Sequence, residues 1–522
     1  MTGSARQALR PQHPSPRSLG GLAEAFGFDA RGDVAGLEIT GASLASGQVE
    51  PGDLYVGVPG RRVHGAAYAA DAAEHGAVAV LTDPAGAELA AGSLAAAGYE
   101  LPVLVTPDAR AALGDVAAWI HRTGENPATL FAVTGTNGKT SVVYLLDALL
   151  RRLGVVSGLS STAERRIGDE AVTSSLTTPE ASELHALLAR MREAGVRAVG
   201  VEVSAQALSR HRVDGLVFDV VGFTNLSHDH FDDYRDFDEY FRAKLELFQP
   251  ERAKRGVVTV DSEWGRRLVD ESRIPVTTLA TEDAAGDADW RMTLVEESAH
   301  FTAFRLDGPG GRTLEARVPL LGRYMAANAA LAIVMLVESG FDLGQIEHAL
   351  GEHGTIDAYI PGRAERISGE RGPVVYIDYG HTPDAFVQTL GAIRRTTEGR
   401  IVMLFGADGD RDTTKRAEMG AIAAREADVV VITDFHPRFE DPAAIRAQLI
   451  AGARAAVPGV ELYEVADPRA AFRRALELAR EGDAILYAGP GHEDYQEVAG
   501  QKIPYSARED AKNALREAGW LA

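Results

Sequence analysis

One short segment constrains the fold more than any other part of the chain. Residues 130–133 are apolar and read as a buried strand, and they run directly into the sequence TGTNGKTS at residues 134–141. A helix is predicted from Thr140, because apolar residues recur at helical spacing between Val143 and Leu150. A strand, a glycine-rich loop and a helix in direct succession predict a β-α unit in a parallel sheet.

The same loop indicates phosphate binding. Gly135 and Gly138 let backbone N–H groups turn toward an anion, and the helix N-terminus adds the positive end of its dipole. Lys139 would reach the terminal phosphates of a nucleotide, and the Thr140 hydroxyl would hold Mg²⁺. The usual pattern has a glycine where this chain has Val133, so we predict a shortened phosphate loop, the alternative being an ordinary glycine-rich turn.

The length of 522 residues predicts about three domains. After a flexible leader (residues 1–18), strands and helices alternate through a small N-terminal α/β domain (19–125), a central domain with a mostly parallel sheet (126–356) and a C-terminal Rossmann-like domain (357–522). The fold class is therefore α/β. In the C-terminal domain the predicted strands cover residues 374–378, 401–405, 429–432, 462–465 and 485–488.

Composition excludes several classes of protein. A net charge of −22 argues against a general affinity for nucleic acid or an anionic membrane, so any phosphate site must be a local pocket of positive groups. The absence of cysteine rules out a disulfide framework, a thiolate metal site and a cysteine nucleophile. We expect a cytoplasmic protein, because no apolar run approaches about 18 residues and the leader lacks the apolar core of a secretory signal.

Two loops that follow predicted strands carry side chains suited to a metal. Glu202 lies near the end of the strand over residues 198–203, and His228 and His230 lie in the loop over residues 223–232. A glutamate, a threonine hydroxyl and a neutral histidine could hold Mg²⁺ beside a nucleotide phosphate. The His-x-His spacing alone would indicate zinc, although two histidines leave such a site incomplete, and His228 taken singly reads as a solvated loop residue.

Lys244 lies in a predicted amphipathic helix. The apolar side of this helix carries Tyr240, Phe241, Leu245 and Phe248. From the residue alone, Lys244 is expected to be a solvated surface lysine.

The order of short motifs along nearly the whole chain resembles that of the Mur ligases. The first group of motifs reads Gly135-Thr136-Asn137-Gly138-Lys139-Thr140, Thr177-Thr178-Pro179, Glu202-Val203-Ser204, Thr224-Asn225-Leu226, Asp229-His230 and Ala243-Lys244. The downstream group is similar to the MurE branch and reads Pro361-Gly362-Arg363, Asp378-Tyr379-Gly380-His381-Thr382-Pro383-Asp384, Gly409-Asp410-Arg411-Asp412 and Gly491-His492-Glu493-Asp494-Tyr495-Gln496.

This resemblance implies an ATP-dependent amide ligase of peptidoglycan precursor synthesis. Its N-terminal domain would bind a UDP-sugar, its central domain ATP and its C-terminal domain a free amino acid. ATP would phosphorylate the D-Glu γ-carboxylate of UDP-MurNAc-L-Ala-D-Glu, and the amine of the third amino acid would displace the phosphate. The resemblance further implies a cytoplasmic monomer that serves cell-wall biogenesis, cell shape and cell division, with no nucleic-acid or membrane partner.

The resemblance also assigns roles to individual residues. Lys139, Glu202, His230 and Lys244 would be catalytic, and Thr140, Glu202, His230 and Lys244 would position Mg²⁺, with Lys244 carried as a carbamate. ATP would contact Gly135, Thr136, Asn137, Gly138, Lys139, Thr140, Ser141, Asn328 (facing adenine), Arg363 and Asp378. The two other substrates would contact Ser46, Thr177, Thr178, Ser204, Arg212, His381, Arg416, Phe435, His436, Pro437, Arg438, Gly489 and Glu493.

The chain departs from the family pattern where substrates are chosen. The family's Asp-Ser-Arg is replaced by Ala45-Ser46-Gly47, and its Ser-Ser-His by Ser204-Ala205-Gln206. Its Asp-Asn-Pro-Arg is replaced by Phe435-His436-Pro437-Arg438, and its Gly-Lys-Gly-His-Glu by Gly489-Pro490-Gly491-His492-Glu493. Met325 replaces an asparagine. Arg438 could pair a distal carboxylate in bidentate fashion. The resemblance therefore favours meso-diaminopimelate, then lysine, with ornithine and diaminobutyrate open.

Four alternatives remain open from sequence. The chain could be a MurE-like paralogue that joins a different amino acid and acceptor, or a non-catalytic paralogue that binds a nucleotide sugar. It could also be a relative of the folylpolyglutamate synthetases, or a P-loop phosphotransferase that makes no amide.

Overall fold

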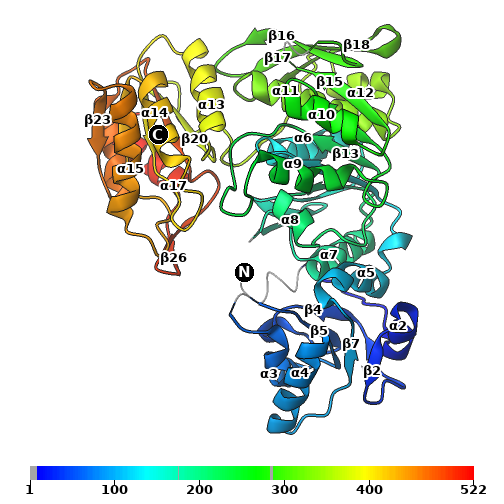
Figure 1. Cartoon of the computed structure of the whole chain (residues 1–522). Helices are drawn as coiled ribbons and strands as arrows, with labels where there is room; N and C mark the ends of the chain where they lie inside the picture. Colours follow the sequence, from blue (N-terminus) through cyan, green and yellow to red (C-terminus); the bar gives the residue numbers. More distant parts are fainter. Residues whose placement is uncertain (1–8, 61, 175, 282–285, 522) are drawn as a thin grey trace. The chain divides into compact units, whose positions relative to one another are not determined.

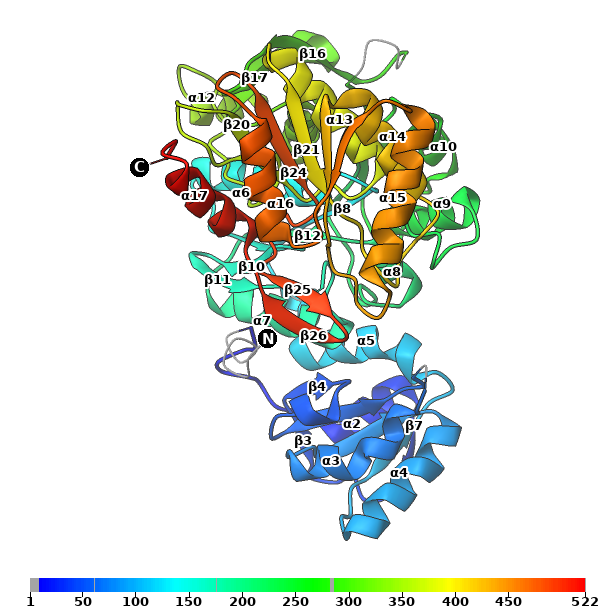
Figure 2. The ribbon, with the colours of Figure 1, turned by 90° about the vertical axis from the view of Figure 1, so that its left-hand side faces the viewer.

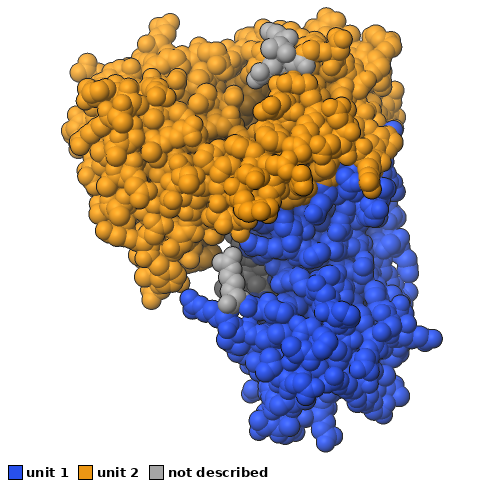
Figure 3. Space-filling model, in the orientation of Figure 1, with its two compact units in different colours: residues 1–132, 154–221, 246–255 blue, residues 133–153, 222–245, 256–522 orange. Residues whose placement is uncertain are grey.

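The computed structural model describes residues 9–60, 62–174, 176–281 and 286–521. The chain forms two compact units, coloured separately in Figure 3. Unit 1 comprises residues 1–132, 154–221 and 246–255, and unit 2 comprises residues 133–153, 222–245 and 256–522. The chain passes from one unit to the other within strands β8 (Thr129–Thr134) and β13 (Val220–Phe223).

The first part of unit 1 is a five-stranded sheet with helices on both faces. The strand order is β2-β7-β6-β5-β4, and all neighbours are parallel except β2 with β7. One face packs on α2 and α5, and the other packs on α3 and α4. The elements are α2 (Leu19–Phe26), β2 (Asp29–Arg31), β4 (Gly41–Ser43), β5 (Asp53–Gly57), α3 (Ala69–Glu74), β6 (Ala79–Thr82), α4 (Pro84–Ala97), β7 (Val103–Val105) and α5 (Ala109–His121).

The leader differs from its prediction in residues 9–18. Arg10 forms an ion pair with the buried Asp53 at 2.7 Å, and strand β1 (Arg17–Ser18) pairs with β3 (Glu38–Ile39). The Arg17 guanidinium also lies over the Trp119 ring at 3.6 Å. This part of the leader therefore has fixed partners, and residues 1–8 lie outside the described part of the chain.

The second part of unit 1 carries predicted acceptor-site residues. Strand β12 pairs with β9 in parallel, and β10 pairs with β9 and β11 in antiparallel fashion. The elements are β9 (Ser157–Ser160), β10 (Glu164–Ile167), β11 (Glu170–Thr173), α7 (Ala181–Glu193), β12 (Ala198–Glu202), α8 (Ala205–Ser209) and the 3-10 turn η4 (Glu246–Phe248).

Unit 2 begins with the helix of the phosphate loop. Strands β14 and β15 are parallel, and β16, β17 and β18 form an antiparallel meander. The elements are α6 (Lys139–Arg152), α9 (Phe237–Leu245), β14 (Gly256–Thr259), α10 (Glu263–Glu271), β15 (Val276–Ala280), β16 (Trp290–Glu297), β17 (Thr302–Gly308), β18 (Arg312–Val318), α11 (Arg323–Glu338) and α12 (Leu343–Leu350).

The C-terminal part of unit 2 is a six-stranded sheet in the order β19-β20-β24-β21-β22-β23, parallel from β20 to β23. Helices α13, α14 and α15 cover one face, and α16 and α17 cover the other (Figures 1 and 2). The elements are β19 (Glu365–Arg366), β20 (Val374–Asp378), α13 (Pro383–Thr396), β21 (Ile401–Phe405), α14 (Arg416–Glu426), β22 (Val429–Ile432), α15 (Pro442–Ala456), β23 (Glu461–Glu464), α16 (Pro468–Leu478), β24 (Ala484–Ala488), β25 (Tyr495–Val498), β26 (Gln501–Pro504) and α17 (Ala507–Glu517).

The predicted α/β class is confirmed, and the C-terminal strands lie within one residue of their predicted bounds. Among the described residues, every helix is too short or too polar to cross a membrane.

Candidate functional site

The phosphate loop needs glycine at two positions. Gly135 has a φ of 149°, and Gly138, the N-cap of α6, has a φ of 89°. A Cβ at Gly135 would lie 1.9 Å from Thr224 Oγ1, and one at Gly138 would lie 2.6 Å from Asn328 Oδ1. Side chains are therefore excluded from the loop backbone, as close approach to a phosphate requires.

Two side chains that the sequence did not assign to the site hold this loop in shape. The Thr224 hydroxyl donates to Asn137 O at 2.6 Å, and Asn225 Oδ1 accepts from Asn137 N at 2.9 Å. Both residues follow β13, and the Thr-Asn-Leu motif was the signal that could have identified them.

Two lysines converge on one carbonyl of the loop. Lys139 Nζ donates to Gly135 O at 3.0 Å and to Thr136 O at 2.8 Å, and Lys244 Nζ donates to the same Gly135 O at 2.9 Å. Lys244 is 1% exposed, and its ammonium lies 4.2 Å from the Tyr240 ring centroid. The expectation of a solvated lysine, drawn from the residue alone, is therefore wrong.

Burial changes the chemistry of Lys244. Desolvation, followed by the nearby charge of Lys139, lowers the pKa of Lys244 well below its ordinary value. Its amine is therefore in the uncharged, nucleophilic form far more often than that of a surface lysine.

His230 belongs to a polar cluster in which Asp229 and Lys415 are buried. It adopts a left-handed backbone with a φ of 60°, and burial lowers the pKa of its imidazole to about 4, so the ring is neutral at pH 7. The neighbouring Asp229 carboxylate lies 3.4 Å from His230 Nε2 and 2.8 Å from Lys415 Nζ. Burial raises the pKa of Asp229, but His230, Lys415 and His381 outweigh burial and hold it well below its usual range.

Lys415 is a site residue that the sequence did not predict. It lies in the C-terminal part of unit 2, immediately before Arg416, which was predicted to bind substrate. The predicted residue His381 lies 3.9 Å from the same Asp229 carboxylate. Arg416 itself is buried and pairs with Glu440 at 2.9 Å, so the structure gives its guanidinium an internal partner.

The C-terminal part of unit 2 also contacts the phosphate loop. Arg363 Nη2 donates to Thr140 Oγ1 at 2.8 Å, and Asn137 Nδ2 donates to Asp384 Oδ2 at 2.9 Å. Asp378 accepts bonds from two backbone N–H groups, those of Ala364 and Gly380, both at 2.7 Å. Arg363 therefore meets the loop directly, whereas Asp378 fixes the backbone beside Arg363.

The predicted amino-acid motif is anchored to β25. His436 Nε2 lies 2.6 Å from Glu493 Oε2, while His436 Nδ1 accepts from Glu497 N at 2.8 Å. Phe435 is buried, and a Cβ at Gly489 would lie 3.6 Å from its ring. A Cβ at Gly409 would lie 2.0 Å from Pro437 O, so the motif packs closely against Gly409 in the loop over residues 409–412.

In unit 1, Glu202 ends β12 with its carboxylate fully buried. It accepts from Thr162 N at 3.0 Å and from Thr162 Oγ1 at 2.9 Å, and Thr178 Oγ1 donates to Glu202 O at 2.8 Å. Arg212 donates to Thr178 O at 3.2 Å and pairs with Glu180 at 2.9 Å. These contacts bring together three of the predicted residues of unit 1, and a fourth, Ser204, donates its N–H to Thr178 Oγ1 at 3.2 Å and caps α8.

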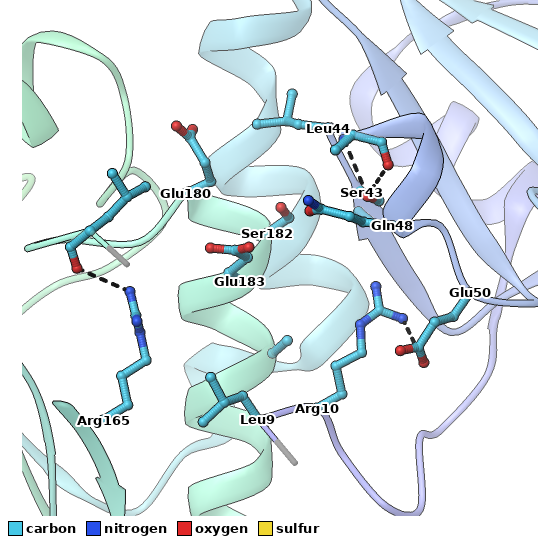
Figure 4. A pocket seen from close by; sticks show the side chains of 14 residues that line it. Leu9, Arg10, Ser43, Leu44, Gln48, Glu50, Arg165, Glu180, Ser182 and Glu183 are labelled. Carbon is cyan, nitrogen blue, oxygen red and sulfur yellow. Dashed lines mark hydrogen bonds and ion pairs between the residues drawn. The ribbon is translucent and has the colours of Figure 1, made fainter. Parts of the chain in front are cut away.

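A cavity of about 180 Å³ lies in unit 1 beside this group (Figure 4). Its wall includes two arginines that the sequence did not predict, Arg10 and Arg165, and three glutamates, Glu50, Glu180 and Glu183. Ser43 and Ala45, on the strand and turn before Ser46, also line it. Arg10 pairs with Glu50 at 3.1 Å, and Arg165 donates to Leu176 O at 3.2 Å.

Within the described residues, no group of three or more His, Asp and Glu side chains could hold a metal ion by itself. A metal at the phosphate loop would therefore take hydroxyl, water and phosphate oxygens as well, which suits Mg²⁺. Thr140 fits this role, because its hydroxyl oxygen accepts from Arg363 and keeps a second lone pair.

A parallel β-α unit with a glycine-walled loop, a lysine at the helix start and a second, buried lysine defines a nucleotide-binding P-loop enzyme. Comparison with known proteins narrows this class. Three family profiles match: Mur ligase family, catalytic domain (residues 38–119), Mur ligase middle domain (133–336) and Mur ligase, glutamate ligase domain (362–491).

Full-length relatives agree. A UDP-N-acetylmuramyl-tripeptide synthetase of Leifsonia xyli is 73% identical over 521 residues, covering 100% of both chains. A UDP-N-acetylmuramoyl-L-alanyl-D-glutamate–2,6-diaminopimelate ligase of Streptomyces avermitilis is 44% identical and covers 97% of this chain and 98% of its own. A solved structure of such a ligase aligns with a TM-score of 0.64 at 25% identity, covering 97% of this chain and 100% of that one.

The chain belongs to the Mur ligase family. Members of this family are ATP-dependent, Mg²⁺-using ligases that form amide bonds, and the chain is an enzyme of this class.

Proposed function

We propose that the chain adds the third amino acid, a diamino acid, to UDP-N-acetylmuramoyl-L-alanyl-D-glutamate with consumption of ATP. The observation that carries this proposal is the pair of lysines on Gly135 O, in a chain that is 73% identical over its full length to a protein named as a tripeptide synthetase. The 44% identical relative named as a diaminopimelate ligase supports the same substrate class.

The chemistry requires an activated carboxylate. The γ-phosphoryl group of ATP moves to an oxygen of the D-Glu γ-carboxylate, ADP leaves, and the amine then attacks the acyl carbon. The tetrahedral intermediate loses inorganic phosphate as its C–O bond breaks, and the amine gives up a proton. Lys139 and the loop N–H groups neutralise charge on the phosphates, which is the main contribution that a protein makes to phosphoryl transfer.

The residues around the loop fit the roles assigned by the resemblance. Thr140 would hold a first Mg²⁺ and the neutral His230 a second, and these ions would supply positive charge to the transferred phosphoryl group when bound. Glu202, a buried carboxylate of unit 1, stays a predicted ligand of the second ion. The Asn328 side chain lies beside Gly138, and Arg363 donates to the Thr140 hydroxyl. Both contacts support the proposed roles of these residues in binding ATP.

Lys244 is proposed to act as a carbamate. Its uncharged amine would add to CO₂, forming an N–C bond and releasing a proton, so a buried cation becomes an anion. The lowered pKa of Lys244 supports this reaction, because only the unprotonated amine attacks CO₂. The resulting carboxylate would help to position the metal.

The acceptor is proposed to bind at the cavity of unit 1. The family's charged residues around Ser46 are absent from this chain, but Arg10 and Arg165 supply guanidinium groups to the cavity wall. The loss around Ser46 favours one second candidate, a paralogue that binds a nucleotide sugar without turnover. The cytoplasm as location and the monomer as functional state remain predictions.

A coupled assay tests the proposal. Purified protein is incubated with UDP-N-acetylmuramoyl-L-alanyl-D-glutamate, Mg-ATP and a panel of diamino acids, and phosphate release and product mass are followed. A ligase releases phosphate only with a complete substrate set, and its product gains one dehydrated amino acid. A stable phosphorylated product would instead indicate a phosphotransferase, turnover only with glutamate-tailed folate would indicate a folylpolyglutamate synthetase, and nucleotide-sugar binding without any turnover would indicate the non-catalytic paralogue.

A further inference from the structure

The guanidinium of Arg438 has an internal partner at each of its nitrogens. Nε donates to Glu497 Oε2 at 3.2 Å, Nη1 donates to Gly409 O at 2.9 Å, and Nη2 lies 3.1 Å from Asp408 Oδ1. A substrate carboxylate needs two parallel N–H groups for bidentate pairing. Two carboxylates and a carbonyl already face the three nitrogens, so a substrate carboxylate would have to share the guanidinium with Asp408 and Glu497.

The backbone of Arg438 is also held. Its φ is 51°, its N–H donates to Glu497 O at 3.0 Å, and its carbonyl accepts from Ala499 N at 2.7 Å. Arg438 is thus bonded on both sides to strand β25 and its turn, and both its side chain and its main chain hold the 435–438 segment against β25.

The neighbouring groups leave the region acidic. His436 Nδ1 accepts a backbone N–H, so its proton lies on Nε2 and is donated to Glu493, which keeps its negative charge. Asp408, Glu493 and Glu497 then face one half-buried cation, Arg438, since the nearby Arg416 is paired with Glu440. The exposed Lys502, on β26, is the strand partner of Glu497 on β25, and its ammonium lies 3.8 Å from the Tyr495 ring centroid. Even when Lys502 is counted, the carboxylates outnumber the cations.

Tyr495 reports the same environment. Burial, followed by the charges of Glu493 and Glu497, raises the pKa of the Tyr495 hydroxyl to about 12. Burial opposes phenol ionisation most strongly, and the negative charges of Glu493 and Glu497 oppose it further.

We infer that the amino acid added by this enzyme carries a distal ammonium and no distal carboxylate. This inference rests on the proposed function and reverses the order of preference that Arg438 suggested from sequence. The carboxylates of Glu493 and Asp408 can bind a distal ammonium, whereas a distal carboxylate would add negative charge to three carboxylates and compete with two of them for Arg438. Lysine, ornithine and diaminobutyrate belong to the accepted class, and meso-diaminopimelate does not.

The wild-type enzyme tests the inference directly. The specificity constant kcat/KM is measured for lysine, ornithine, diaminobutyrate and meso-diaminopimelate with saturating UDP-N-acetylmuramoyl-L-alanyl-D-glutamate and Mg-ATP. We expect the best monocarboxylic diamino acid to exceed meso-diaminopimelate by about 100-fold or more. A preference for meso-diaminopimelate overturns the inference and leaves the proposed function intact, whereas turnover with none of the four overturns the proposed function itself.

Two variants test the physical cause. Asp408→Asn and Glu497→Gln each remove a negative charge beside Arg438, so each should shift the ratio of kcat/KM values by about 10-fold toward meso-diaminopimelate. Glu477→Gln removes an exposed charge of α16 that pairs with Arg474, and it should leave the ratio unchanged. Unaltered ratios in folded Asp408→Asn and Glu497→Gln enzymes would overturn the electrostatic argument, and the wild-type panel decides the inference if either variant fails to fold.

Discussion

His185 on α7 lends itself to a quantitative prediction. Its side chain is fully buried, Nδ1 lies 2.7 Å from Thr123 Oγ1, and Nε2 lies 2.9 Å from Asp214 O. A carbonyl only accepts, so Nε2 carries the proton and Nδ1 accepts from the Thr123 hydroxyl, which describes a neutral ring. Burial lowers the pKa of His185 to about 4.

The sign and size of the pH effect follow from linkage. The unfolded chain binds a proton to this histidine with a pKa of about 6.5, whereas the folded protein resists the proton until the pH approaches 4. Stability is therefore fully present above pH 6.5 and is lost as the pH falls toward 4. At pH 5 the loss from His185 is about 2 kcal/mol. His121, whose pKa burial lowers to about 3, acts in the same direction.

Urea unfolding of wild type and of His185→Gln, followed by circular dichroism at pH 7.5 and pH 5, tests this value. A glutamine amide can keep the bond to Asp214 O but does not titrate, so the variant should lose about 2 kcal/mol less free energy of unfolding than wild type between the two pH values. The exposed His13, replaced by Gln, serves as the control and should follow wild type. If His185→Gln loses as much stability as wild type, His185 is not held neutral by burial.

Three further predictions concern the phosphate loop, Lys244 and the Asp229–Lys415 pair. Gly135→Ala should weaken ATP binding, measured by calorimetry, by at least about 10-fold, because the new Cβ would lie 1.9 Å from Thr224 Oγ1. Adding Thr224→Ala to this variant should recover part of the lost affinity. If no affinity is recovered, this clash is not the cause. Lys244→Met should abolish ligation yet leave the ATP dissociation constant within about 3-fold of the wild-type value. Wild-type activity should fall when bicarbonate and CO₂ are removed. Retained ligation in the variant would contradict the catalytic role of Lys244. Lys415→Met should lower the free energy of unfolding by about 3–5 kcal/mol, because it leaves the buried Asp229 charge without Lys415. Adding Asp229→Asn to this variant should restore part of the lost stability. Equal stability of Lys415→Met and wild type would refute the pairing.

The sequence predicts well those features that consecutive residues determine. Strands such as β20, β21 and β22 are short apolar runs bounded by turns, and their bounds match the prediction. The phosphate loop is also contiguous, so the order of residues alone is enough to identify its glycines and its lysine.

Contacts between distant residues could not be predicted in this way. Lys415 meets Asp229 across 186 positions, and Arg10 meets Asp53 across 43. The burial of Lys244 depends on which side of α9 faces the loop, which the helical pattern alone left unresolved. Likewise, the carboxylates that pair with Arg438 come from outside its motif, Asp408 from a loop and Glu497 from β25, so its side chain suggested a carboxylate site from sequence alone.

The threading of the chain through both units has a consequence for its synthesis. Residues 246–255 are the last segment of unit 1 to be synthesised. After residue 132 has been made, unit 1 therefore stays incomplete until about 120 more residues have been added. At 5–20 residues per second this interval lasts roughly 6 to 25 s. The loop of residues 134–141 waits longer still, because Arg363, Asp384 and Lys415 are added afterwards. We therefore expect the cavity of unit 1 to form on the ribosome well before the polypeptide can bind ATP productively.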